Sequence, residues 1–83
     1  MRLDKFLKVS RLIKRRTVAN EVSDSGRILV NNFPAKPAKQ VKEGDIISIV
    51  YANKTLSVEI LRVPLTNSVP VQEASSLYKV LED

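Results

Sequence analysis

The chain has 83 residues, and its 14 Lys and Arg side chains outnumber the 9 Asp and Glu side chains to give a formal charge of +5. This length allows one small domain, and no apolar run approaches the ~20 residues that span a bilayer. The sequence contains neither Cys nor His, which excludes disulfides, thiolate or imidazole metal ligands and two common nucleophile–base pairs. We therefore expect a cytoplasmic protein that is not an enzyme, has no catalytic residue and uses no metal or other cofactor.

A first short helix is predicted near the amino end. Leu3, Phe6 and Leu7 follow the i, i+3, i+4 spacing of one buried stripe. Asp4 falls in the first turn, where the helix dipole favours a carboxylate. Ser10 is expected to interrupt the helix, because its hydroxyl competes for backbone hydrogen bonds.

A second helix is predicted from about residue 14 to residue 25. Val18, Ala19 and Val22 are expected to turn inward. Gly26 follows directly and is the residue type that most often ends a helix in a left-handed conformation.

After the second helix the pattern changes to that of short strands. Residues 27–30 form a β-branched run, and Asn31-Asn32 can supply the positive φ of a tight turn. Residues 33–37 contain two prolines and must be an edge or irregular segment. Residues 45–50 and 55–63 are expected to form a second hairpin. Two helices followed by a small antiparallel sheet make an α+β domain.

The carboxyl end is expected to be a short tail behind a linker. Residues 64–72 are rich in turn formers. The spacing of a short amphipathic helix is then shown by Ala74, Leu77, Tyr78 and Leu81. We therefore divide the chain into a domain at 1–63, a linker at 64–72 and a helical tail at 73–83. So short a helix needs a docking surface, which we expect to be its own domain, the alternative being a partner protein.

The positive charge is concentrated in the first third of the chain. Residues 1–27 hold eight basic and three acidic side chains, whereas the remainder is neutral. Such asymmetry is typical of a surface that binds phosphate groups, as in nucleic-acid recognition. The alternative is a solvated helix surface that only keeps the protein in solution.

Four separated segments of the chain together form one recognisable string of residue types at fixed spacings. They are Arg2-Leu3-Asp4-x-x-Leu7, Arg16-x-x-Ala19, Gly26-x-Ile28-x-Val30-Asn31 and Val41-x-x-Gly44-Asp45. This string resembles the S4 RNA-binding domain family over roughly residues 1–50. The resemblance implies an S4-type fold, in which two N-terminal helices pack on a small antiparallel sheet and dock against structured RNA.

The opening and closing stretches resemble a free-standing bacterial branch, the RqcP (YabO) family of ribosome-associated quality-control factors. That resemblance implies partners: large-subunit rRNA and peptidyl-tRNA on a split ribosome, and the tailing factor RqcH, which adds alanine to the stalled chain. It also implies that Arg2 and Arg16 make the main rRNA contacts. The expected RNA-binding residues are Arg2, Lys5, Lys8, Arg11, Lys14, Arg15, Arg16, Asn20 and Arg27. Off the ribosome we expect a monomer.

Two further expectations concern how RNA is recognised. Asp4 would be repelled by phosphate, so we expect it to be the acid of the first helical turn or to orient Arg16, and not to touch RNA. The chain has four aromatic residues, too few for a platform on which bases stack, so recognition of shape and backbone is expected.

Three alternatives stay open. One is a binder of double-stranded DNA, although the second helix lacks a row of base-reading side chains apart from Asn20. Another is a fragment of an RNA-modifying or aminoacylating enzyme, which the position of Met1 directly before the motif disfavours. The last is a heat-shock-type S4 protein that binds structured rRNA without the tailing factor.

Overall fold

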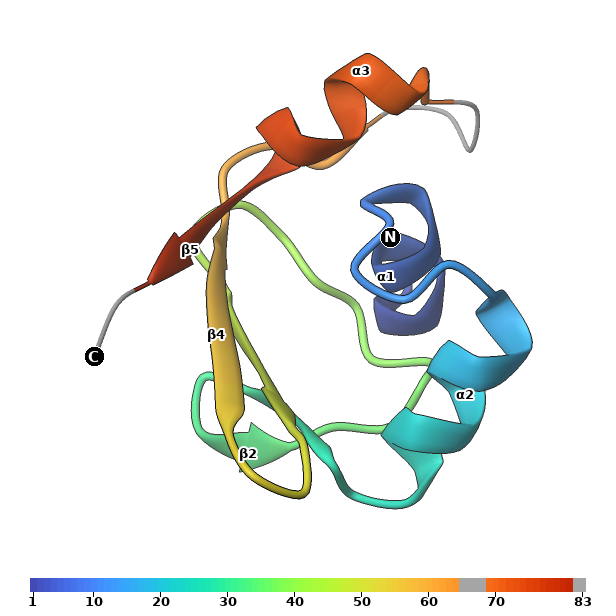
Figure 1. Cartoon of the computed structure of the whole chain (residues 1–83), viewed down its shortest axis with the longest axis vertical. Helices are drawn as coiled ribbons and strands as arrows, with labels where there is room; N and C mark the ends of the chain where they lie inside the picture. Colours follow the sequence, from blue (N-terminus) through green and yellow to red (C-terminus); the bar gives the residue numbers. More distant parts are fainter. Residues whose placement is uncertain (65–68, 82–83) are drawn as a thin grey trace.

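A computed structural model describes residues 1–64 and 69–81 of the chain. One antiparallel sheet with the strand order β2-β1-β3-β4-β5 carries two helices on one face (Figure 1). The strands are β1 (Ile28–Val30), β2 (Phe33–Pro34), β3 (Ile46–Val50), β4 (Thr55–Ile60) and β5 (Tyr78–Leu81). The helices are α1 (Leu3–Val9), α2 (Arg16–Asp24) and α3 (Val71–Ala74), which continues into the 3-10 turn η1 (Ser75–Leu77). Within the described ranges, no helix is long and apolar enough to cross a membrane.

Helix α1 packs its apolar stripe into the core, as predicted. Leu3, Phe6 and Leu7 are completely buried. The helix ends at Ser10, whose hydroxyl donates a hydrogen bond to the Leu7 carbonyl at 3.2 Å. Alternate residues of the strands supply the other wall of the core, because successive side chains of a strand point to opposite faces. These are Ile28, Val30, Ile47, Ile49, Val58 and Ile60.

Helix α2 begins two residues later than predicted, and its inner face agrees with the prediction at Ala19 and Val22 but not at Val18. Ala19 and Ser23 are fully buried, and the Ser23 hydroxyl donates to the Ala19 carbonyl at 2.7 Å. The prediction that Val18 turns inward is wrong, since 40% of its surface is exposed. Val18 lies about 100° around the helix from Ala19, at the border of the buried face. Gly26 has φ +84°, which confirms its role as the helix stop.

The first hairpin turns at Asn31-Asn32, as predicted. Both residues have positive φ, 52° and 71°, and β2 is an edge strand that accommodates its proline. The Asn31 side chain donates to the Asp45 carboxylate at 3.1 Å and accepts from the Ile46 amide at 3.0 Å. This turn is therefore tied directly to the start of β3. The second hairpin, β3–β4, pairs Ile46 with Glu59 through to Val50 with Thr55.

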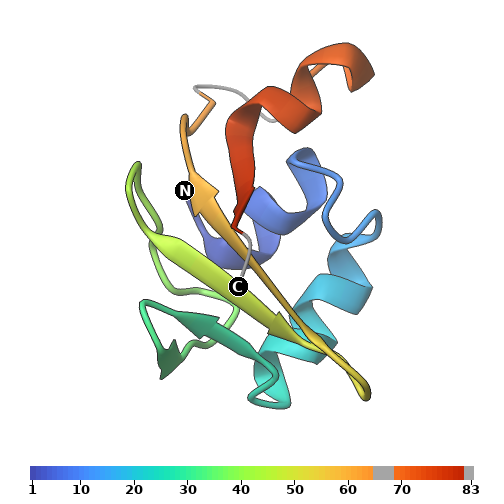
Figure 2. The ribbon, with the colours of Figure 1, turned by 60° about the vertical axis from the view of Figure 1, so that its left-hand side comes forward.

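The tail departs from the prediction. Its helical part runs from Val71 to Leu77, so it begins inside the expected linker, and residues 78–81 form strand β5 in place of helix. Strand β5 pairs with β4 from Ile60–Tyr78 to Ser57–Leu81 (Figure 2). An unpaired edge of β4 supplies backbone partners that a helix could not use, so tertiary context overrides the helical spacing. The remaining parts of the predicted linker and tail, 65–68 and 82–83, lie outside the described residues.

The tail packs against its own domain. Leu77 is fully buried in the main core and Ala74 is 3% exposed. The amides of Leu61 and Arg62, just after β4, both donate to the Leu77 carbonyl, at 2.8 and 3.2 Å. The tail is thus part of the folded domain.

Candidate nucleic-acid interface

The start of α1 holds an arginine against a buried carboxylate. Asp4 is 1% exposed. Arg2 donates to its two oxygens through Nε and Nη2, each at 3.2 Å, and the Lys5 amide donates to Oδ1 at 2.8 Å. Two parallel N–H···O bonds fix the plane of a guanidinium as well as its position. Arg2 is therefore held in one orientation while 43% of its side chain stays exposed.

The first turn of α2 brings a second arginine to the same carboxylate. Arg16 approaches Asp4 Oδ2 through its Nε at 3.5 Å, and Asn20, one turn later, donates to that oxygen at 3.4 Å. The Arg16 side chain is 48% exposed. Its contact uses Nε, which leaves both Nη groups for other acceptors. The expectation that Asp4 orients Arg16 agrees with this geometry.

The charge state of Asp4 is set by these partners. Burial by itself raises the pKa of the carboxyl, because the charged form loses solvation. Hydrogen bonds from Asn20 and Arg2, together with the positive charges of Arg2 and Arg16, outweigh burial and lower the pKa of Asp4 below its ordinary value. Asp4 is therefore ionised at neutral pH and holds both guanidinium groups by charge.

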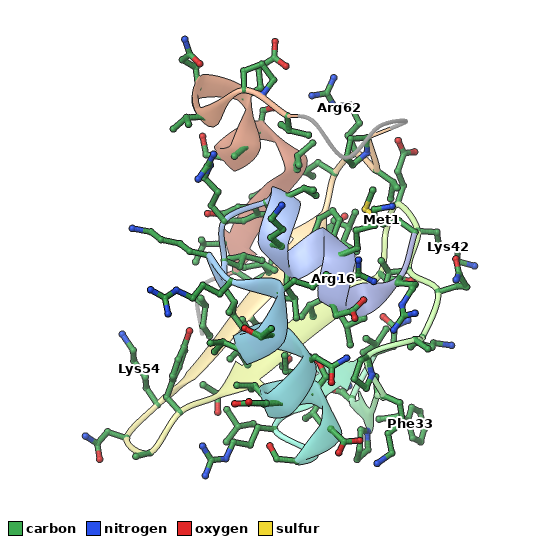
Figure 3. The ribbon with its side chains drawn as sticks, turned by 90° about the vertical axis from the view of Figure 1, so that its right-hand side faces the viewer. Met1, Arg16, Phe33, Lys42, Lys54 and Arg62 are labelled. Atoms are coloured by element: carbon green, nitrogen blue, oxygen red, sulfur yellow. The ribbon has the colours of Figure 1, made fainter. Side chains whose placement is uncertain are left out.

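A loop between β2 and β3 frames the site from the other side. The Leu3 amide donates to the Lys39 carbonyl at 2.8 Å, and the Asp4 amide donates to the Pro37 carbonyl at 3.2 Å. The amino-terminal ammonium donates to Gln40 Oε1 at 3.1 Å. A surface depression results, lined by Met1, Arg2, Lys5, Arg16, Gln40, Val63 and Pro64. Its cations come from two separate parts of the chain, the amino end and the start of α2; Figure 3 labels Met1 and Arg16.

The structure gathers some of the expected RNA-binding residues and leaves others apart. Arg2, Lys5 and Arg16 line one depression, and Asn20 contacts their shared carboxylate. The remaining members are exposed, on α1 or in the connection to α2: Lys8, Arg11, Lys14 and Arg15. Arg27 lies beyond α2, where its carbonyl accepts from the Val50 amide at 2.9 Å, so it is not part of the Asp4 cluster.

Sequence reasoning missed the basic residues of the loop that follows β2. Lys36, Lys39 and Lys42 recur every third residue in a stretch, 33–42, that contains no acid. Totalling charge over residues 28–83 hid them, because the acids that balance them occur elsewhere in the sequence. A shorter window would have found this signal.

Comparison with known proteins identifies the family of the chain. The S4 domain family model matches residues 1–47. A protein of Halalkalibacterium halodurans named RQC P-site tRNA stabilizing factor is 55% identical over the whole chain and 92% of that protein. The protein of the same name from Bacillus subtilis is 46% identical over the whole chain and 94% of its own length.

Relatives of the heat-shock type are more distant in sequence but share the fold. A heat shock protein 15 homologue of Haemophilus influenzae is 33% identical over 74% of this chain and 47% of that protein. The trimeric structure of Vibrio cholerae Heat Shock Protein 15 superposes with a TM-score of 0.86 at 28% identity, covering 98% of this chain and 81% of that one. The solution structure of hypothetical protein HP1423 superposes with a TM-score of 0.85 at 34% identity, covering 100% of this chain and 99% of that one. The chain therefore belongs to the S4 domain family, and within it to the family of RQC P-site tRNA stabilizing factors.

Proposed function

We propose that this protein binds large-subunit rRNA and P-site peptidyl-tRNA on a split ribosome, and so supports the addition of alanine to the stalled chain by the tailing factor RqcH. It acts in the cytoplasm as a binding factor, not as an enzyme, and arrives as a monomer. The observation that carries the proposal is the pair of half-exposed arginines, Arg2 and Arg16, held on one buried carboxylate. It stands in a chain 55% identical to a protein named for stabilising P-site tRNA.

The geometry suits RNA backbone. An arginine presents several N–H donors in a planar fork that matches two phosphate oxygens, and it stays charged at any physiological pH. Two forks fixed by one carboxylate bind phosphates without first losing side-chain freedom. If about five phosphates are neutralised in all, RNA affinity falls roughly 10²–10³-fold between about 50 and 200 mM salt.

The site has two sources of cations, which supports a role in stabilising bound tRNA. Arg2 lies directly before α1 and Arg16 begins α2, while Lys39 and Lys42 come from the loop that pairs with the amino end. Cations that face in more than one direction can bridge two RNA molecules. A tRNA bridged to rRNA in this way dissociates more slowly, so the stalled chain stays in place while alanine is added.

The test is co-sedimentation with large subunits that carry peptidyl-tRNA. Wild-type protein is expected in the heavy fractions, and Arg2→Ala and Arg16→Ala in the light ones. Lys79→Ala is the matched control: it removes the same charge from β5, opposite Glu59 on the sheet face away from the helices, and is expected to sediment like wild type. Sedimentation of wild type with intact ribosomes, messenger RNA or DNA instead would contradict the proposal.

The structural match to Heat Shock Protein 15 supports one second candidate, an rRNA-binding factor that acts without the tailing factor. Alanine addition to peptidyl-tRNA on purified large subunits separates the two. With RqcH present, wild-type protein is expected to lengthen the alanine tails and Arg16→Ala to leave them short. Equal tails with and without the protein would favour the second candidate.

A further inference from the structure

Phe33 in the edge strand β2 is an aromatic side chain left almost entirely in water. It is 74% exposed, the largest fraction among the large apolar side chains of the described residues. Figure 3 shows it at the rim of the molecule, standing away from the sheet. A single exposed apolar side chain is common and needs no function. The position of Phe33 and the side chains beside it, however, indicate a function.

The ring lies on the side of the sheet that carries the helices. Phe33 is directly opposite Val30 in the β1–β2 register, and cross-strand neighbours project from the same face. Val30 is 5% exposed and belongs to the core beneath α1 and α2. Phe33 therefore shares its side of the molecule with Arg2 and Arg16, beyond the edge of the helical layer.

Two lysines stand beside the ring in a fixed frame. Phe33, Lys36 and Lys39 line one surface depression. The Lys39 amide donates to the Lys36 carbonyl at 3.0 Å, and the Lys39 carbonyl accepts from Leu3. The only acid paired with this group in the described chain is Asp24, 3.6 Å from the Lys36 ammonium, and both side chains are at least 70% exposed. Such an exposed pair is weak and yields readily to a phosphate.

We propose that Phe33 stacks against an unpaired base of the bound RNA, while Lys36 and Lys39 bind the phosphates on either side of that nucleotide. Aromatic rings combined with flanking cations are the means by which proteins hold unpaired bases. The positive charge beside the ring argues for RNA over a protein surface as the occupant. This inference rests on the proposed function for RNA binding and adds to it a preference for a bulged or looped nucleotide.

The site joins the arginine cluster through the loop between β2 and β3. Lys39 lines the Phe33 depression, whereas its neighbour Gln40 lines the depression of Arg2 and Arg16. The backbone of this loop is hydrogen-bonded to the amino end: the Leu3 amide donates to the Lys39 carbonyl, and the Val41 amide donates to the Met1 carbonyl. One RNA can therefore meet both regions, and their relative position is fixed by the fold.

The experiment compares two hairpin RNAs that differ by one bulged nucleotide, with 2-aminopurine placed in the bulge as a fluorescent probe. Wild-type protein is expected to bind the bulged RNA at least about fivefold more tightly and to quench the probe on binding. Phe33→Trp is expected to keep both effects. Phe33→Leu and Phe33→Ala are expected to lose both, although Phe33→Leu retains an apolar side chain. Because the ring is exposed, all three variants are expected to fold, which circular dichroism checks.

The outcomes separate this inference from the proposed function. Equal binding of the two hairpins by wild type, or an unchanged preference in Phe33→Ala, overturns the stacking site even if the protein sediments with large subunits. A preference for the bulge that depends on the aromatic ring supports the site even if sedimentation fails. If only Phe33→Ala, and not Phe33→Leu, lowers binding to large subunits and neither hairpin is preferred, the ring contacts protein and the inference is wrong.

Discussion

Arg16 meets Asp4 through its Nε atom, not through the end of its guanidinium group, at 3.5 Å from Oδ2. Arg2 meets the same carboxylate with Nε and Nη2. Asp4 therefore holds Arg16 by Nε alone and Arg2 by Nε and Nη2, which leaves Nη1 of Arg2 and both Nη groups of Arg16 outside these contacts. On the proposed function, a carboxylate in the middle of this basic surface favours anion binding, because it fixes where the cations point.

Asp4→Asn is expected to weaken RNA binding even though it adds a unit of positive charge to the protein. Loss of the carboxylate frees Arg2 and Arg16 to adopt many rotamers, and ordering them again on RNA costs about 0.5–1.5 kcal/mol each. Fluorescence anisotropy with a structured RNA at fixed salt measures the change. Tighter binding by Asp4→Asn would show that net charge, not orientation, sets affinity.

The stability of the protein is expected to depend on the ionisation of Asp4. Its pKa is lowered in the folded state, so its stabilising contribution is present above the unfolded value of about 3.9 and is lost as the pH falls through the lower folded value. Urea unfolding of wild type and Asp4→Asn between about pH 2 and 7 is the measurement. Wild type is expected to be more stable by about 1–3 kcal/mol at neutral pH, and the difference should shrink toward acid pH. A difference that stays constant with pH would contradict this assignment.

Arg16→Lys is expected to reduce RNA affinity about tenfold, the value of one charge-assisted hydrogen bond. Lysine keeps the charge but cannot contact Asp4 and a phosphate at the same time through separate nitrogens. The dependence of affinity on salt should therefore stay the same, whereas Arg16→Ala should lower its slope by about 1. A salt titration of RNA binding by the three proteins measures both effects. Equal affinity of Arg16→Lys and wild type would argue against simultaneous contact of the Arg16 guanidinium with Asp4 and a phosphate.

The Asn31-Asn32 turn predicts opposite effects for its two residues. Asn31→Ala removes side-chain hydrogen bonds to Asp45 and to the Ile46 amide, and should cost about 1–3 kcal/mol of unfolding free energy. Asn32→Gly relieves a positive φ of 71° and should add up to about 1 kcal/mol, since the φ > 0 region suits glycine. Urea midpoints with unchanged m-values would confirm both signs. Stabilisation by Asn31→Ala would contradict the bonding seen here.

The tail is expected to contribute to stability through one buried residue. Leu77→Ala leaves a cavity in the core and should cost about 2–5 kcal/mol. Val80→Ala is the matched control in the same segment, because Val80 is 50% exposed, and it should cost well under half as much. Thermal and urea unfolding measure both. Equal small effects would mean that the tail is not part of the cooperative unit.

The sequence predicts most of this fold because its turn residues and apolar spacing agree. The positive φ values at Gly26 and Asn31 follow from residue type alone. The tail could not be predicted in the same way. Its spacing fits a helix, and what decides its conformation is the open edge of β4, which exists only after the sheet has formed.

Some residues of the candidate site could likewise be predicted from the sequence and others could not. Arg2, Asp4 and Arg16 follow from the motif and from the charge pattern. Phe33 does not, because an aromatic side chain in an edge strand can be covered by neighbouring elements or left in water, and residue type alone does not decide which. The two prolines of residues 33–37 predict the edge position of β2, whereas the elements that cover or do not cover Phe33 there are set by the strand order and the tertiary packing.

The bonding of the amino-terminal ammonium to Gln40 has a practical consequence for anyone who labels this protein. A fluorophore or affinity peptide joined before Met1 would replace that ammonium and place its linker in the depression with Arg2 and Arg16. In Figure 1 strand β5, whose end at Leu81 is the other place to attach a probe, points away from the amino end. Probes attached there keep clear of the arginine pair, so binding measured with them reports on the protein and not on its tag.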